Sequence, residues 1–130
     1  NIMAAMSNYL ETALVNAVLR NTSYTSPATV YVGLFTSDPT DAGSGTEVSG
    51  GSYARKSMAF VAPTDGATSN SSAVEFDQAT ASWGTVTHFG LFDASSSGNL
   101  LLHGALTASK TIDDGDVFKF ATSALTATFA

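Results

Sequence analysis

Short segments of strand character, separated by turn residues, make up most of the chain after Pro27. Gly, Asp, Asn and Ser interrupt these segments about every 8 to 12 residues, a rhythm typical of β-sandwiches and barrels. The segments are TVYVGLF, SYARKSMAF, AVEF, ATASW, VTHFGLF, LLLHGAL, VFKFA and ALTATF. No heptad run, internal repeat or collagen-like glycine period indicates an elongated shaft. We therefore predict a mainly β fold, an antiparallel β-sandwich of about eight short strands.

One helix is expected before these strands. In SNYLETALVNAVLRN the apolar residues recur at helical spacing, at Leu10, Ala13, Leu14, Ala17 and Val18. Asn8 is placed to cap this helix, and Glu11 follows three residues later. We predict a short amphipathic helix over residues 8–20. Its apolar stripe packs either on the core of the domain or against a neighbouring subunit, so Leu10, Leu14 and Val18 are interface candidates.

The length of 130 residues suits one domain with one hydrophobic core. Met6 followed by SNYLE resembles a natural start. We therefore expect residues 1–6 to be an N-terminal extension and residues 7–130 to form the domain. The first residues lack the basic end and apolar core of a signal peptide, and no apolar run approaches the roughly 20 residues that cross a bilayer. Neither export by the Sec route nor a membrane partner is expected.

Charge is scarce along the chain. Charged residues make up 12% of it, and 11 acidic against 5 basic residues give a net charge of -6. The basic residues are scattered, which argues against nucleic acid as a partner. Cysteine is absent, so disulfides and thiolate metal ligands are excluded and the fold depends on packing.

Both histidines lie in HFGLFDASSSGNLLLHGAL, residues 88–106. This stretch predicts a β-hairpin in which His88 lies opposite His103 and Phe89 opposite Leu102. The register gives the hairpin one apolar face, formed by Phe89, Leu91, Leu100 and Leu102. The two imidazoles would then lie side by side on the other face.

A metal site at these histidines is a weak alternative. Zinc needs three or four ligands, and only a carboxylate such as Asp93 could join His88 and His103. The preferred interpretation is a hairpin with two partly exposed histidines, in which Asp93 and Gly98 shape the turn. No metal and no cofactor are expected.

Catalytic patterns are weak throughout. Glu75 and Asp77 share one face of a strand, as paired carboxylates of glycosidases can, but Val74 and Phe76 on the other face make ordinary strand alternation the simpler explanation. The acidic stretches SDPTDAG and DDGD fit tight turns better than a calcium loop. No nucleophile elbow or phosphate-binding glycine motif is found. We therefore expect a protein that is not an enzyme.

Three further residues are candidates for contacts with a partner. Tyr53 and Trp83, with Tyr31, could form a stacking platform for sugars, although aromatic residues serve more often in cores and interfaces. Arg55 and Lys56 form a small basic spot in an acidic chain. Arg55 could pair with a neighbouring subunit or bind a ligand. Tyr53, Arg55 and Trp83 join the helix residues as interface candidates.

Several blocks of the sequence resemble one family of small virion proteins from tailed bacteriophages, usually labelled tail-fibre or minor tail proteins. They are EVSGGSYAR (47–55), WGTVTHFGLFDA (83–94) and the GDVFKF strand near the end, within a similarity that runs from Ser7 onward. The resemblance implies a β-rich, non-enzymatic structural protein of the virion, assembled in the host cytoplasm. It supplies no catalytic residues.

The resemblance leaves the place on the particle open. The chain has no fibre shaft of its own, so a capsid decoration or cement role stands beside a tail-associated one. Its expected partners are other virion proteins and further copies of itself, and a trimer is one expected closed assembly. The alternative function is a carbohydrate-binding module that recognises host-surface glycans.

Overall fold

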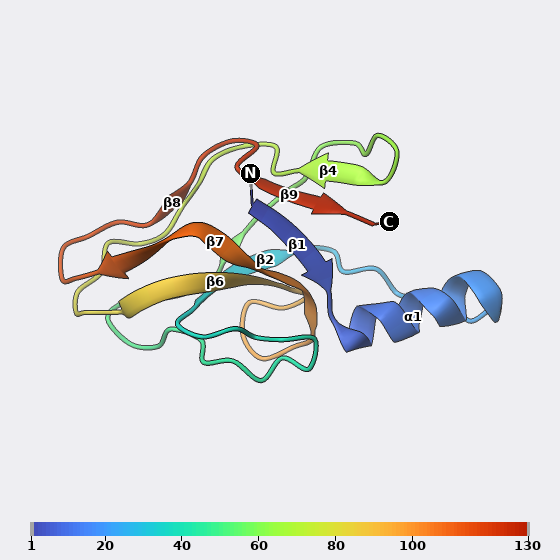
Figure 1. The fold of residues 1–130 in the computed structure, drawn as a ribbon, viewed down its shortest axis with the longest axis horizontal. Coiled ribbons are helices and arrows are strands. Elements are labelled where there is room, and N and C mark those ends of the chain that lie inside the picture. Colours follow the sequence, from blue (N-terminus) through green and yellow to red (C-terminus); the bar gives the residue numbers. More distant parts are fainter. Residues whose placement is uncertain (1, 130) are drawn as a thin grey trace.

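The computed structural model describes residues 2–129 and shows a mainly β chain with a helix near its N-terminus (Figure 1). The described residues contain α1, Asn8–Leu19, and nine strands. The strands are β1 Ile2–Met6, β2 Tyr31–Phe35, β3 Lys56–Ser57, β4 Ala67–Ser69, β5 Val74–Glu75, β6 Gly84–Phe92, β7 Leu100–Ile112, β8 Lys119–Phe120 and β9 Leu125–Thr128. The mainly β fold with one short helix is thus confirmed. Over the same range, no helix has the length and apolar character needed to cross a membrane.

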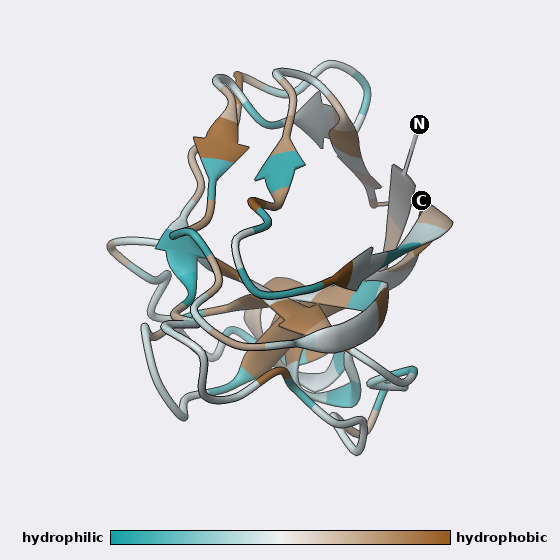
Figure 2. Ribbon diagram, turned by 90° about the vertical axis from the view of Figure 1, so that its left-hand side faces the viewer, coloured by the Kyte–Doolittle hydropathy of each residue, from teal (hydrophilic) through white to brown (hydrophobic). Residues whose placement is uncertain are grey.

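The strands do not form the antiparallel sandwich that the sequence predicts. Seven of them make one sheet in the order β3-β2-β6-β7-β1-β9-β4, and β5 and β8 form a separate pair. Strand β1 is antiparallel to β7 but parallel to β9, so the large sheet is mixed. Figure 2 shows this sheet curled, with the two short strands of the small sheet lying across from it.

Residues 2–6, which the sequence suggests as part of an N-terminal extension, form strand β1 of the large sheet. This strand pairs with β7 on one side and β9 on the other. An unbroken apolar run such as IMAAM is typical of a strand inside a sheet. Ala4 is buried and pairs with Ala127. The polar residues after Met6 therefore mark a strand-to-helix junction.

The β6–β7 hairpin forms, but its register differs from the prediction. Leu91 lies opposite Leu102, so His88 faces Ala105 and His103 faces Gly90. A register shift follows between Leu91 and Phe92. The irregularity places one extra residue of β7 between these two pairs, which strict strand alternation does not predict. The two histidines consequently share a face without lying opposite each other.

The same irregularity divides the predicted apolar face. Phe89, Leu91 and Leu102 belong to the main core, whereas Leu100 packs with Phe35 and Phe92 in a second cluster. The turn itself is as expected. Asp93 accepts hydrogen bonds from the backbone and side-chain nitrogens of Asn99 at 2.7 and 3.0 Å, and Gly98 has a φ of 75°.

Aromatic side chains fill the interior between the two sheets. The ring of Phe76 lies 5.8 Å from that of Phe118 and 6.3 Å from that of Phe120, centroid to centroid. Phe120 in turn lies 6.3 Å from Phe89 of the central strand β6. Phe76 is only 2% exposed. This cluster holds the small sheet against the large one.

The N-cap of helix α1 lies one residue earlier in the sequence than predicted. Ser7, not Asn8, is the N-cap: its Oγ accepts from the Leu10 amide at 3.2 Å. The same hydroxyl donates to the Leu100 carbonyl at 2.5 Å, which ties the start of the helix to β7. The helix ends at Leu19, with Arg20 as its C-cap.

Replacing Ser7 with Ala removes both hydrogen bonds, and Ser7 is buried at 1% exposure. We expect the free energy of unfolding to fall by about 1–2 kcal/mol. Urea unfolding followed by circular dichroism measures the change. The control is Ser49→Ala, an exposed position where the change should stay within about 0.5 kcal/mol. Equal effects at the two positions would show that the cap has no special role.

Candidate functional site

The EVSGGSYAR block closes on itself through a partly buried ion pair. Arg55 Nε and Nη2 donate to the two carboxylate oxygens of Glu47, each at 2.8 Å. The Arg55 side chain is 8% exposed and that of Glu47 is 24% exposed. A planar guanidinium matches a carboxylate in this two-pronged geometry. The charge of Arg55 is therefore balanced within its own chain.

Arg55 also joins this block to the turn of the β6–β7 hairpin. Its Nη1 donates to the carbonyls of Ala94 and Ser97 at 3.0 and 2.8 Å. Its guanidinium carbon lies 3.5 Å from the ring centroid of Phe92, which adds a cation–π contact. Two of the blocks that carry the family resemblance thus meet at one arginine.

Tyr53 completes this polar cluster. Its hydroxyl donates to Glu47 Oε2 at 2.6 Å and accepts from the Leu34 amide at 2.9 Å. A Cβ at Gly33 would lie 2.7 Å from Glu47 Oε2 and 3.0 Å from the Tyr53 hydroxyl, so this position of β2 has no room for a side chain. Burial, and then the hydrogen bond and charge of Glu47, raise the pKa of Tyr53 far above its ordinary value of 10.

The raised pKa of Tyr53 predicts a loss of stability in alkali. The unfolded chain loses the phenol proton near pH 10, whereas the folded chain keeps it. The folded state then binds more protons, so the free energy of unfolding falls as the pH rises above about 10. Urea unfolding between pH 8 and pH 11 should show a steeper fall for the native chain than for Tyr53→Phe. Parallel curves for the two proteins would contradict the expectation.

Trp83 lies in the core. It is 4% exposed, and its indole nitrogen donates to the Gly51 carbonyl at 2.9 Å. The Tyr53 ring packs edge-on against Trp83, 5.4 Å between centroids, and is stacked with Phe76. A sugar platform needs exposed ring faces, and the Tyr53–Trp83 pair does not supply one.

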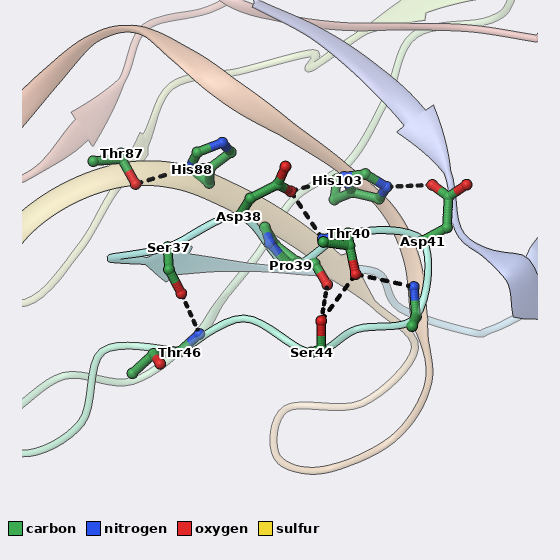
Figure 3. A network of polar contacts seen from close by, with 11 residues as sticks. Ser37, Asp38, Pro39, Thr40, Asp41, Ser44, Thr46, Thr87, His88 and His103 are labelled. Carbon is green, nitrogen blue, oxygen red and sulfur yellow. Dashed lines mark hydrogen bonds and ion pairs between the residues drawn. The ribbon is translucent and has the colours of Figure 1, made fainter.

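The histidines occupy separate polar environments (Figure 3). His103 lies between two aspartates of the 37–43 loop, with Nε2 2.7 Å from Asp41 Oδ1 and Nδ1 3.9 Å from Asp38 Oδ1. His88 Nδ1 instead lies 2.8 Å from the hydroxyl of Thr87. Asp93, the expected third ligand, belongs to the hairpin turn. Residues 2–129 contain no group of three or more His, Cys, Asp or Glu side chains placed to hold a metal ion.

The contact of His103 with Asp41 anchors the 37–43 loop beside the start of α1. The Asp41 carbonyl accepts from the Asn8 amide at 2.9 Å, and the Asp38 carboxylate accepts from the Thr40 amide at 2.8 Å. These contacts agree with the expectation of a tight turn. They make the loop a support for the helix.

The helix candidates separate along the length of α1. Leu10 is 5% exposed and packs in the core, and Leu14 is partly buried against it. Val18 is 75% exposed and Leu19 is 77% exposed. Figure 1 shows why, because α1 extends away from the sheets at one end of the molecule. The first half of the helix therefore packs on the core of the domain. The outer half faces solvent and is free to contact a neighbouring subunit.

The carboxylates in and just after β5 lie as strand alternation predicts. Val74 and Phe76 are buried, while Glu75 and Asp77 are exposed. Asp77 accepts from Lys56 Nζ at 2.9 Å across to β3. This arrangement describes a solvated strand face.

Two tyrosines that no sequence pattern marks as a site border an open groove beside α1. The groove has a volume of about 600 Å³, and Tyr9 and Tyr24 both line it. Burial and the nearby Tyr9 and Asp93 raise the pKa of Tyr24. Tyr9 lies in the first turn of α1 and Tyr24 lies after the end of the helix, so only the chain reversal after α1 brings them together.

Comparisons with known proteins place the chain among phage proteins. No curated protein matches it. The family model of the Podophage GP4 fiber I protein gp80 does match, over residues 5–128, which is nearly the whole chain. That span includes the Glu47–Arg55 cluster, the hairpin and α1. The protein therefore belongs to the family of the Podophage GP4 fiber I protein gp80, a family of phage fibre structural proteins.

Proposed function

We propose that this protein is a non-enzymatic structural subunit of a phage fibre, exposed on the virion and attached to other virion proteins. The family match over residues 5–128 is the observation that carries this proposal. Because the match names a fibre protein, it favours the tail-associated role over capsid decoration or cement.

The distribution of contacts supports a structural role. The polar groups of Glu47, Tyr53 and Arg55 make hydrogen bonds within the chain. These bonds hold the 47–55 segment against the β6–β7 hairpin. The large apolar side chains left exposed include Val18 and Leu19 on the projecting helix. Exposed apolar side chains gathered on one element are typical of a protein–protein contact.

Location on purified particles tests the proposal. Gold-labelled antibodies against the purified protein, viewed by electron microscopy, should decorate the tail fibres. The control is the same particles with antibody that has been absorbed with the protein. Label in a regular array over the capsid would support the decoration role instead, and particles that contain none of the protein would overturn a virion role.

The Tyr9–Tyr24 groove favours glycan binding as a second candidate function. Its lining contains no charged residue, only tyrosine, alanine and the polar residues Asn, Ser and Thr. Aromatic faces with uncharged hydrogen-bonding groups suit a neutral sugar. In this proposal, the glycan site lies beside α1 and not at Tyr53 and Trp83.

A panel of neutral oligosaccharides, titrated into the protein and followed by NMR, tests this candidate. Shifts should be confined to residues around α1 and be lost in Tyr24→Ala. Tyr31→Ala, on strand β2, serves as the control and should keep them. The absence of any shift at α1 would remove the glycan function and leave the structural one in place.

A further inference from the structure

The outer face of α1 has the character of a contact surface. Glu11, Leu14, Val15 and Val18 stand at positions i, i+3, i+4 and i+7, which places them on one side of a helix. Leu19 borders the same side. Val15, Val18 and Leu19 are 52%, 75% and 77% exposed. We name these five residues the α1 stripe: an apolar surface with one carboxylate in it, whose inner member Leu14 also packs against the core.

A groove between β7 and β8 is the complementary feature. It has a volume of about 330 Å³. Most of its lining is apolar or small, including Leu106, Phe118 and Phe120, and Lys110 and Lys119 border it. We name it the β7–β8 groove.

The lysines of this groove differ from the other basic residues of the chain. Arg55 pairs with Glu47, Lys56 with Asp77, and Arg20 donates to Asn16. Within residues 2–129, neither Lys110 nor Lys119 has a carboxylate oxygen within 4.0 Å, although Glu75 lies opposite Lys119 across the β5–β8 pair. In a chain with a net charge of -6, both unpaired lysines thus border one apolar groove.

We propose that the α1 stripe of one copy docks into the β7–β8 groove of a second copy, with Glu11 placed near Lys110 and Lys119. The apolar side chains of the stripe would cover the apolar lining of the groove, and the charges are opposite in sign. Parallel packing of two α1 stripes against each other would instead bring two Glu11 carboxylates together, which is unfavourable. The charge pattern therefore favours docking of the stripe into the lysine-bordered groove over parallel packing of two stripes.

The position of the two surfaces gives this contact a direction. Figure 1 shows α1 at one end of the longest axis of the molecule, and β8 with the C-terminal part of β7 toward the other end. A contact between two different surfaces is heterologous, so each copy can receive one neighbour and insert into another. Repetition joins copies end to end, in a ring if the rotation closes and in a filament if it does not. The inference rests on the proposed role as a fibre subunit and identifies one of its partners as a further copy of the chain.

Mixing two defective variants of the full chain tests the heterologous contact. Val18→Glu damages the stripe, and Lys110→Glu with Lys119→Glu damages the groove; all three residues are exposed. Sedimentation velocity should show assemblies for the native chain, and each variant alone should associate about tenfold or more weakly. A mixture should form a dimer of one copy of each variant, because one intact stripe still meets one intact groove.

Two controls separate this result from loss of folding. Circular dichroism should give the same spectrum for the native chain and both variants. Val61→Glu changes an exposed valine away from both surfaces and should leave association unchanged. Adding Glu11→Lys to the groove variant restores opposite charges and should recover part of the association.

Three results would overturn the docking proposal. They are a native chain that stays monomeric, a groove variant that associates like the native chain, and a mixture of the two variants that forms no dimer. Particle labelling is independent of these measurements. Assembly in solution without label on the particle would leave the docking contact standing and remove the fibre role, whereas labelled fibres built from a chain that fails the mixing test would do the reverse.

Discussion

Replacing Arg55 with Met should lower the free energy of unfolding by about 3–5 kcal/mol, the usual loss when one partner of a buried ion pair is removed. Glu47 would keep its charge at 24% side-chain exposure but lose both guanidinium hydrogen bonds. The carbonyls of Ala94 and Ser97 would lose a donor as well. Urea unfolding at neutral pH measures the change.

Lys56→Met is the matched control for Arg55→Met. The neighbouring Lys56 also pairs with a carboxylate at 2.9 Å, but its side chain is 32% exposed and that of Asp77 is 58% exposed. An exposed pair of this kind contributes about 0–1 kcal/mol. If the two substitutions lower stability equally, the Glu47 cluster does not hold the loop to the hairpin in the way described.

Replacing Phe76 with Ala should lower the free energy of unfolding by about 3–5 kcal/mol, because it opens a cavity in the aromatic interior. Phe76 is 2% exposed, and its ring meets those of Tyr53, Trp83, Phe118 and Phe120. The small sheet depends on these contacts for its place on the large one. Thermal and urea unfolding should both report the loss.

Phe129→Ala provides the comparison for Phe76→Ala, because Phe129 is 43% exposed. Its removal should change the free energy of unfolding by about 1 kcal/mol or less. A small effect at Phe76 would mean that the two sheets are held together mainly by their other contacts.

Local pattern predicted the individual elements well. Helical spacing identified α1 to within one residue of its end, and alternation identified the buried and exposed sides of AVEFD. The turn with Asp93 and Gly98 also formed as its residues predict. Each of these features depends on residues close together in the chain, where side-chain period and turn chemistry act directly.

Pairing between distant segments was not predictable in the same way. The register of the β6–β7 hairpin differs from the prediction already at the turn, where Phe92 pairs with Leu100, and an irregularity between Leu91 and Phe92 shifts it further. The residues of the candidate site show the same limit. The sequence marks Arg55 as a basic residue, but only the folded loop shows that it pairs with Glu47. Tyr9 and Tyr24 line the same groove only because the chain reverses after α1.

The sequence by itself determined the strand-rich character, the helix, the turns and the likeness to phage fibre proteins, because these depend on local periodicity and on residue identity. Only the tertiary structure decided that residues 2–6 form an inner strand, that Arg55 and Trp83 are internal, and that Val18 and Leu19 face solvent. Burial and ion pairing are properties of surfaces brought together from distant parts of the chain. A charged or apolar residue carries the same letter in the sequence whether the fold covers it or leaves it free for a partner.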